Sequence, residues 1–299
     1  MSLVKNYAIG IVDIHMPCGY DMLHGGMLMT QTACIAVWTN KGGNGKTCTA
    51  TTLARWSGFG AARLLIDLDP QANASLACGF PLDSRRLGIS EALLRHSFPE
   101  NPQLHVDLDD GTVFIPADIR MPDLDLLLHK TNGTPTLALA QLLSDVDGAD
   151  IIVIDCPPGE NIYSRMALAA ADYLLIPTTL DSGAATGIQQ ALSVCKKIKF
   201  GNPARNEPAR NENLKILGVF FNKVPSVKVN ICEEIRKVIV DFCKNNEIRV
   251  FNSEIKERIS PMTYIGANQQ SVFELPENNK LRIEFTELCK EVKEALNER

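Results

Sequence analysis

Residues 33–47, with the sequence ACIAVWTNKGGNGKT, decide the fold class. Their first part, Cys34 to Thr39, predicts a buried strand, and a helical pattern follows at 46–58. Between the two, glycines let the backbone curl until successive N–H groups point at one phosphate, and the helix N-terminus adds a partial positive charge. The stretch therefore predicts a phosphate-binding loop between a strand and a helix.

The order of residues in this loop assigns chemistry to individual side chains. Lys46 is expected to reach the β- and γ-phosphates of a nucleotide, and the Thr47 hydroxyl is expected to hold Mg²⁺. The general P-loop pattern is G-x-x-x-x-G-K-[ST], whereas this chain has Asn40 at the first position and a second lysine, Lys41, after it. The alternative is a glycine-rich turn without a ligand, which the preceding strand and following helix disfavour.

The rest of the chain alternates apolar runs with helical patterns. Strands are predicted at Arg63 to Ile66, Val113 to Pro116, Ile151 to Ile154, Tyr173 to Ile176, Leu217 to Phe221 and Ile248 to Phe251. Helices are predicted near 86–97, 122–130, 134–146, 161–171, 184–199, 230–245 and 280–297. Apolar strands separated by helices predict an α/β, doubly wound fold: a mostly parallel sheet with helices on both faces.

The 299-residue chain has the composition of an ordinary globular protein. It is 45% hydrophobic and 22% charged and has no long apolar run, which argues against disordered, collagen-like and membrane-spanning classes. A net charge of −5 gives no overall positive field, so any DNA contact must come from a local patch. The nine cysteines never form a C-x-x-C spacing, which argues against a zinc site or redox pair and fits a reducing cytoplasm.

Three carboxylates follow predicted strands. Asp67 and Asp69 lie in the sequence DLDPQAN, and Asp155 directly follows Ile151 to Ile154. Carboxylates at the carboxyl edge of such a sheet lie beside the crevice where α/β proteins bind ligands, although a simple turn is the alternative for the first two. An acid that ends a buried strand is the Walker B arrangement, which predicts that Asp155 holds Mg²⁺ through water.

These motifs resemble the ParA/MinD family of P-loop ATPases, whose deviant Walker A box carries the early lysine. The resemblance covers about residues 33–296. It implies that Lys41 reaches across a dimer interface to the partner's nucleotide, that Asp69 positions the attacking water, and that Asp67 supports Mg²⁺ or the loop. It implies ATP/ADP and Mg²⁺ as cofactors, with nucleotide contacts from Gly42, Gly43, Asn44, Gly45, Lys46, Thr47 and Cys48.

Two further segments bear on the resemblance. ParA-type ATPases continue the Walker B strand as D-x-P-P-S, whereas Gly159-Glu160 replaces that ending here. Asn222 ends a predicted strand, and its amide can pair with the adenine edge, which is the role that the family gives the matching residue. A turn-forming asparagine is the alternative.

The resemblance also implies a function. An ATP-bound homodimer that hydrolyses ATP slowly would bind nonspecific DNA and partition a plasmid, chromosome or other cargo, in the cytoplasm and associated with the nucleoid. A ParB-like, cargo-bound partner would stimulate hydrolysis. Lysines and arginines must replace phosphate counterions on such a surface. By resemblance the candidates are Arg258, Lys223 and Lys228, with Lys196, Lys197 and Lys199 as a weaker set; solvated surface charges are the alternative.

Three other functions remain open. A MinD-like membrane-surface ATPase needs a basic amphipathic C-terminal helix. Residues 281–299 have apolar residues at helical spacing but a polar face of net charge −1, so this helix is expected to dock on its own core and no membrane partner is predicted. An iron–sulfur carrier would need a suitable cysteine pair. A metabolic P-loop ligase would lack the early lysine, so replacing Lys41 separates that class.

Regions outside the motifs give weaker predictions. Residues 1–31 are expected to be an extension that is not native or is poorly ordered, ahead of a single ATPase domain at 32–299. Seven acids within 100–125 predict a solvated acidic loop. The pentad PARNE occurs at 203–207 and again at 208–212, which predicts a loop that has tolerated a duplication.

Overall fold

The computed structural model describes residues 32–83, 87–96, 104–130, 134–202, 207–227, 230–258 and 271–298. Within these ranges, eight strands form one sheet in the order β3-β4-β2-β5-β1-β6-β7-β8. They are β1 (Ala33–Val37), β2 (Arg63–Asp67), β3 (Val106–Asp107), β4 (Thr112–Ile115), β5 (Ile151–Asp155), β6 (Tyr173–Thr178), β7 (Lys215–Val224) and β8 (Val250–Lys256). Neighbouring strands are parallel except β3 and β4. The predicted extension at 1–31 lies outside the described residues.

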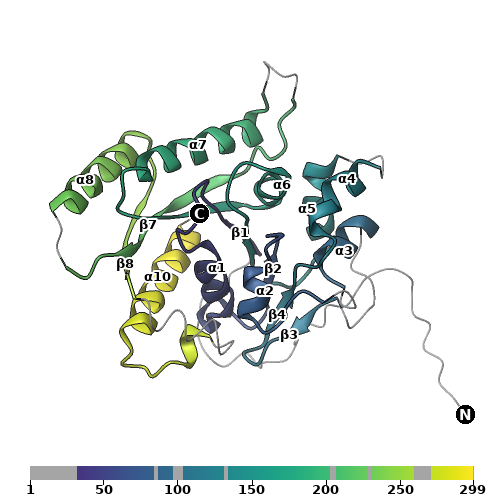
Figure 1. The fold of residues 1–299 in the computed structure, drawn as a ribbon, viewed down its shortest axis with the longest axis horizontal. Coiled ribbons are helices and arrows are strands. Elements are labelled where there is room, and N and C mark those ends of the chain that lie inside the picture. Colours follow the sequence, from purple (N-terminus) through teal and green to yellow (C-terminus); the bar gives the residue numbers. More distant parts are fainter. Residues whose placement is uncertain are drawn as a thin grey trace, which may run out of the picture.

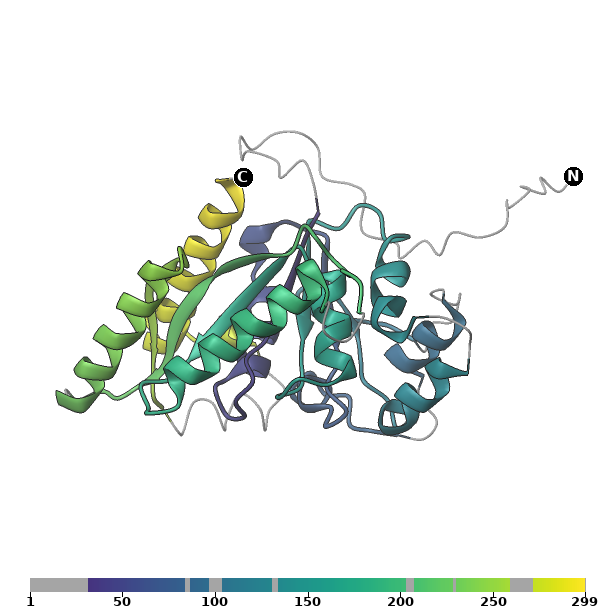
Figure 2. The same cartoon turned by 90° about the horizontal axis from the view of Figure 1, so that it is seen from above.

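Helices cover both faces of this sheet (Figures 1 and 2). The α-helices are α1 (Lys46–Arg55), α2 (Asn73–Ala77), α3 (Ile89–Arg95), α4 (Leu124–His129), α5 (Ala138–Leu143), α6 (Ile162–Ala170), α7 (Ala184–Phe200), α8 (Asn230–Asn245) and α10 (Lys280–Asn297). Short 3₁₀ turns are η1 (Ser57–Phe59), η2 (Met121–Asp123), η3 (Pro135–Leu137) and η5 (Val272–Glu274). This architecture confirms the predicted doubly wound fold.

Successive side chains of β1 enter two different cores because strand residues alternate between the faces of a sheet. Cys34 and Ala36, with Trp38 just after the strand, pack with helices α3 to α8. Ala33 and Ile35 pack on the opposite side with α1 and α10. Because β1 is buried between β5 and β6, the loop that follows it is held at the centre of the sheet's carboxyl edge.

Helix α10 closes the second core. Its apolar residues Leu281, Phe285, Leu288, Val292 and Leu296 are all buried, which confirms that this helix docks on its own core. In the part of the chain that the structure describes, no helix is long and apolar enough to cross a membrane.

The sequence patterns did not predict two short elements. The two-residue strand β3 and the five-residue helix α2 are too short to produce a periodic pattern. Strand β1 also ends at Val37, so Thr39 belongs to the loop that follows. The remaining predicted strands and helices are present, with ends that differ by a few residues.

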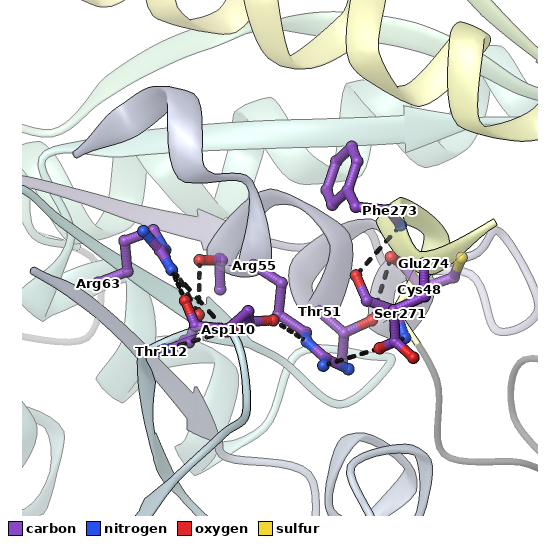
Figure 3. Close-up of polar contacts among 10 residues, drawn as sticks. Cys48, Thr51, Arg55, Arg63, Asp110, Thr112, Ser271, Phe273 and Glu274 are labelled. Carbon is purple, nitrogen blue, oxygen red and sulfur yellow. Dashed lines mark hydrogen bonds and ion pairs between the residues drawn. The ribbon is translucent and has the colours of Figure 1, made fainter. Parts of the chain in front are cut away.

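The prediction of a solvated acidic loop at 100–125 was wrong for two of its acids. The Asp110 carboxylate accepts a hydrogen bond from Arg55, and the Asp110 main-chain oxygen accepts one from Arg63 (Figure 3). Asp118 is buried and accepts hydrogen bonds from Ser90 and Arg120. Because Arg55 and Arg63 are themselves buried, they need anionic or carbonyl partners, and this segment provides them.

Candidate functional site

The loop between β1 and α1 has the backbone of a phosphate-binding loop. Gly43 and Gly45 have φ angles of +79° and +83°, a region that side chains other than glycine rarely adopt. A Cβ added at Gly42 or Gly43 would meet no atom within 4 Å, whereas one at Gly45 would lie 2.1 Å from the Asn222 amide nitrogen. The loop therefore has open space beside Gly42 and Gly43 and is closely packed against Asn222 at Gly45.

A pocket of about 600 Å³ opens beside this loop. Most of the sequence-predicted site residues line it, namely Gly42, Gly43, Gly45, Lys46, Thr47, Cys48, Asp69, Asn222, Lys223 and Arg258. The sheet explains the convergence, because β1, β2, β7 and β8 all present their carboxyl ends at this edge. A concave site with several convergent polar groups is the expected form of a small-molecule site.

Lys46 begins α1 and lies between the loop and the carboxylates. Its ammonium group donates a hydrogen bond of 3.0 Å to the main-chain oxygen of Lys41. Burial lowers the pKa of Lys46, and the neighbouring Asp155 acts in the opposite direction. A buried cation at the start of a helix adds to the positive end of the helix dipole, so this corner of the pocket favours an anion.

Asp155 lies at the end of β5, opposite Val37 of β1 and Asp67 of β2. Its side chain is fully buried, and neither carboxylate oxygen has a hydrogen-bond partner among the described residues. Burial, and secondarily the charge of Asp67, raise the pKa of Asp155 well above its usual range. The Thr47 hydroxyl lies near enough to lower that pKa, though outside hydrogen-bond geometry.

This unpartnered carboxylate suits a hard divalent cation. A buried acid without a partner is costly unless something positive meets it. Mg²⁺ typically uses one or two carboxylates and completes its shell with water and phosphate oxygens. Asp155, with the Thr47 hydroxyl beside it, therefore fits a magnesium ion that also binds a nucleotide.

Asp67 ends β2 and Asp69 lies just beyond it, and the two side chains have different surroundings. The Asp67 carboxylate accepts hydrogen bonds from the Asp69 N–H at 3.1 Å, from the Ser75 N–H at 2.8 Å and from the Ser75 hydroxyl at 2.7 Å. Burial nevertheless raises the pKa of Asp67 to about 6. Asp69 accepts a 2.9 Å hydrogen bond from Gln71 through one oxygen and lines the pocket. Asp67 thus holds the loop, and Asp69 is the acid at the pocket.

The second lysine of the loop pairs with an acid that does not line the pocket. The Lys41 ammonium group forms an ion pair of 2.7 Å with Asp181, in the segment between β6 and α7. Both side chains are exposed to solvent, by 45% and 38%. Burial alone would raise the pKa of Asp181, but hydrogen bonds from Lys41 and Thr179 lower it. Lys41 therefore lies at the surface, within reach of another molecule.

Asn222 joins β7 to the phosphate-binding loop. Its amide nitrogen donates a hydrogen bond of 2.9 Å to the main-chain oxygen of Asn44, and its amide oxygen accepts one from the Lys223 N–H. These contacts fix the side chain at the pocket wall, where one amide hydrogen and one oxygen lone pair remain available. Pairing with adenine stays a prediction.

The predicted DNA-binding residues have mixed positions. Lys223 and Arg258 line the pocket beside the P-loop. Arg258 forms a two-fold ion pair with Glu284 of α10, at 2.5 and 2.6 Å. Lys228 lies outside the described residues. Lys197 pairs with Glu160, and Lys196 is exposed.

Sequence reasoning missed the partners of the site residues. Asp181, Ser75 and Glu284 each hold a predicted residue in place. Only Asp181 had a usable signal, because it follows a predicted strand as Asp155 does. The other two partners lie on helices, where a single polar residue carries no pattern.

Comparison with known proteins assigns the chain to a family. Residues 32–207 match the model of the AAA domain family. The chromosome partitioning protein ParA of Myxococcus xanthus is 32% identical over 209 residues, which are 68% of this chain and 70% of that protein. The chain belongs to the ParA family.

Two solved structures resemble the ParA-type fold seen here. A McdA variant from Cyanothece in complex with ATP has a TM-score of 0.72 and 20% identity, covering 89% of this chain and 96% of that one. Cobyrinic acid a,c-diamide synthase from Mycobacterium smegmatis with bound ADP and magnesium has a TM-score of 0.64 and 26% identity, covering 80% and 92%. The first likeness, at this identity, concerns the fold alone.

Proposed function

We propose that this chain is an ATPase that dimerises with bound ATP, binds DNA without sequence preference and partitions or positions a cargo. The observation that carries the proposal is the unpartnered Asp155 carboxylate beside a P-loop that has a second, exposed lysine. Family membership and the ATP- and ADP-bound relatives support nucleotide binding.

The pocket residues divide the binding of Mg·ATP among themselves. The main-chain N–H groups at Gly42 to Lys46 and the Lys46 ammonium would hold the phosphates, and Thr47 and Asp155 would hold Mg²⁺. Bound Mg²⁺ supplies neutralisation of the charge that develops on the phosphates. Asp69, with one oxygen anchored by Gln71, would orient the attacking water. Positioning and charge neutralisation of this kind suffice for slow hydrolysis.

Dimerisation and DNA binding follow from the family role. Lys41 must leave Asp181 to reach a partner's nucleotide, and its exposure permits this. Arg258, Lys223 and Lys228 remain the proposed DNA contacts, of which the first is restrained by Glu284. A cargo-bound activator of the ParB kind would trigger hydrolysis and release, and attachment to DNA would locate the protein on the nucleoid.

The amide-forming ligase named among the structural relatives favours a second candidate, a metabolic P-loop ligase. Lys41 discriminates between the two functions. A ligase has no need for a lysine that leaves its own pocket, whereas a ParA-type switch loses ATP-dependent dimerisation without it. The apolar face of α10 packs on the sheet, which disfavours a membrane-surface role for this helix.

The decisive experiment measures retention on nonspecific double-stranded DNA with ATP, ADP or no nucleotide across a salt series. We expect binding with ATP alone that weakens as salt rises, because counterions compete for the phosphates. In parallel, sizing chromatography should show that Lys41→Ala stays monomeric with ATP, whereas Asp69→Ala accumulates as a dimer. Lys290→Ala is the matched control, since Lys290 is also an exposed lysine in an ion pair and does not line the pocket.

Four results would contradict parts of the proposal. Salt-independent retention, or none with ATPase activity intact, would exclude the DNA-based mechanism and point to a protein or membrane scaffold. Normal dimerisation of Lys41→Ala would exclude the role across the interface, and unimpaired hydrolysis by Asp69→Ala would exclude its role in orienting water.

A further inference from the structure

Helix α7 contacts both loops of the nucleotide pocket through two of its polar side chains. Gln190 accepts a hydrogen bond of 2.5 Å from the Asn40 side chain, at the start of the P-loop. Lys197 donates to both oxygens of Glu160, at 2.9 and 3.2 Å, in the loop between β5 and α6. Residues 190 and 197 are two helical turns apart, so both lie on the same side of α7.

The two loops also contact each other directly. The Gly159 N–H donates a hydrogen bond of 3.0 Å to the Asn40 main-chain oxygen. The Gly159 oxygen accepts hydrogen bonds from the Trp38 indole at 3.3 Å and from the Ser164 hydroxyl at 3.0 Å. Gly159 has a φ of +82°, a conformation suited to glycine, and Glu160 follows it directly. The P-loop, the loop after β5 and α7 therefore form one connected set of contacts.

The side chains that reach α7 are not required by phosphate binding. The general P-loop pattern has glycine where this chain has Asn40, and the Asn40 amide is directed to Gln190 on α7. Glu160 likewise binds α7, whereas Pro158 of the same loop lines the pocket. A change in the backbone of either loop would thus change a contact with α7.

We propose that Asn40 and Glu160 are positioning residues that couple the two nucleotide-pocket loops to α7, so that a nucleotide that orders α1 also orders α7. The inference rests on the proposed function only in requiring that a nucleotide occupies the pocket. Its consequence is a nucleotide-dependent surface at the carboxyl end of α7, where Lys196 is exposed and Phe200 is 68% exposed.

Hydrogen–deuterium exchange with and without Mg·ADP tests this coupling. In the wild type, we expect nucleotide to slow amide exchange in both α1 and α7. In Glu160→Gln and in Lys197→Gln, nucleotide should slow amide exchange in α1 as it does in the wild type. Its effect on exchange in α7 should be about two- to fivefold smaller, which is the size of effect expected from losing a partly exposed ion pair. Asn40→Gly should act in the same direction because it removes the contact with Gln190.

Two controls separate coupling from a loss of fold. Lys196→Gln removes a neighbouring positive charge for which the described residues show no contact with the loop after β5, and it should behave as the wild type. The charge-reversed pair Glu160→Lys with Lys197→Glu should restore the slowing of α7 that either single change removes. All variants are compared by thermal melting without nucleotide.

The outcomes are distinguishable. If Mg·ADP fails to slow α1 in the wild type, nucleotide binding fails and the inference falls with the proposed function. Two results would refute the coupling alone. In one, Mg·ADP slows amide exchange in α1 of the wild type but not in α7. In the other, Mg·ADP slows exchange in α7 of Glu160→Gln as much as in the wild type.

Discussion

The ends of β2 and β5 carry aspartates in the same register of one sheet, yet their surroundings are opposite. Asp67 pairs with Asp155 across the two strands, and both are fully buried. Asp67 accepts three hydrogen bonds from Asp69 and Ser75, whereas neither oxygen of Asp155 has a partner in the described chain. Equal burial thus accompanies unequal hydrogen bonding.

The difference separates a structural acid from a binding acid. A buried carboxylate with a full set of donors stabilises the loop that supplies them. A buried carboxylate without donors destabilises the empty protein and gains its partner only when a cation arrives. Removing a hydrogen-bond donor of Asp67 should therefore lower stability, whereas removing the unpartnered Asp155 charge should not, and the following predictions test this difference.

The largest effect is expected for Asp155→Asn. Hydrolysis should fall about 100- to 1000-fold, because the cation site loses its charge. The nucleotide-free protein should melt at the same or a higher temperature than the wild type, since an unpartnered buried charge is gone. Activity assays and thermal melts with and without Mg·ATP measure both. A variant that melts lower without nucleotide would show that Asp155 has a structural role and would end the comparison.

The next effect is the pH dependence of stability without nucleotide. Unfolded Asp67 ionises near pH 3.8, whereas the pKa in the fold is about 6. Between these values the folded state holds a proton that the unfolded state has lost, so stability falls as pH rises from about 4 to about 6, by about 3 kcal/mol from this group. The raised pKa of Asp155 acts in the same direction.

Urea denaturation at intervals across this range, with a chelator present, measures the slope. Asp67→Asn should flatten it, because the titrating group is absent. The lowered pKa values of Glu91, Glu254 and Asp181 have the opposite sign but act below their ordinary values of 4.5, 4.5 and 3.8. A slope that is unchanged in Asp67→Asn would refute the assignment.

The sequence predicted the aspartates and the P-loop but not the residues that contact them. The P-loop was predictable because its glycines and Lys46 are contiguous, and Asp155 was predictable because it ends an apolar run. The partners of these residues were not. Lys41 and Asp181 are 140 residues apart, and Glu160 and Lys197 are 37 apart, so only the folded sheet brings them together.

The acidic segment at 100–125 is a second case in which the sequence did not reveal the contact partners. Its composition predicted solvated acids, because composition does not reveal that an arginine of α1 lies beneath it. Once β4 pairs with β2, the turn that carries Asp110 lies over Arg55 and Arg63. Local pattern predicted the strand but not what the preceding turn would contact.

A smaller effect is expected from removing one of the hydrogen bonds that hold Asp67. Ser75→Ala removes a donor to Asp67 and the acceptor of the Ala117 N–H, at 2.7 and 2.9 Å. The free energy of unfolding should fall by about 2 kcal/mol, since one lost bond is to a charged group and an N–H loses its partner. Ser144→Ala, at an exposed hydroxyl, is the control and should change it by less than about 0.5 kcal/mol. Equal effects of the two variants would contradict this role for Asp67.

The smallest effect is expected for Asp110→Asn. This variant tests, outside the nucleotide site, whether an acid with hydrogen-bond donors stabilises the fold. Asp110 accepts hydrogen bonds from Arg55 and from the Thr112 N–H, and the Arg55 side chain is only 7% exposed (Figure 3). The asparagine can keep the Thr112 contact but leaves the Arg55 charge without its main partner. Because Asp110 is 26% exposed, water compensates in part, and the loss should be about 1 kcal/mol.

The control for this variant is Asp125→Asn, whose carboxylate is 51% exposed and faces His129 on the same helix. It should leave the free energy of unfolding unchanged within about 0.5 kcal/mol. Asp110→Asn and Asp155→Asn both remove one negative charge, so net charge cannot explain opposite signs of their effects. If both variants raise stability, the hydrogen-bond partners do not decide the sign, and the distinction between structural and binding acids fails.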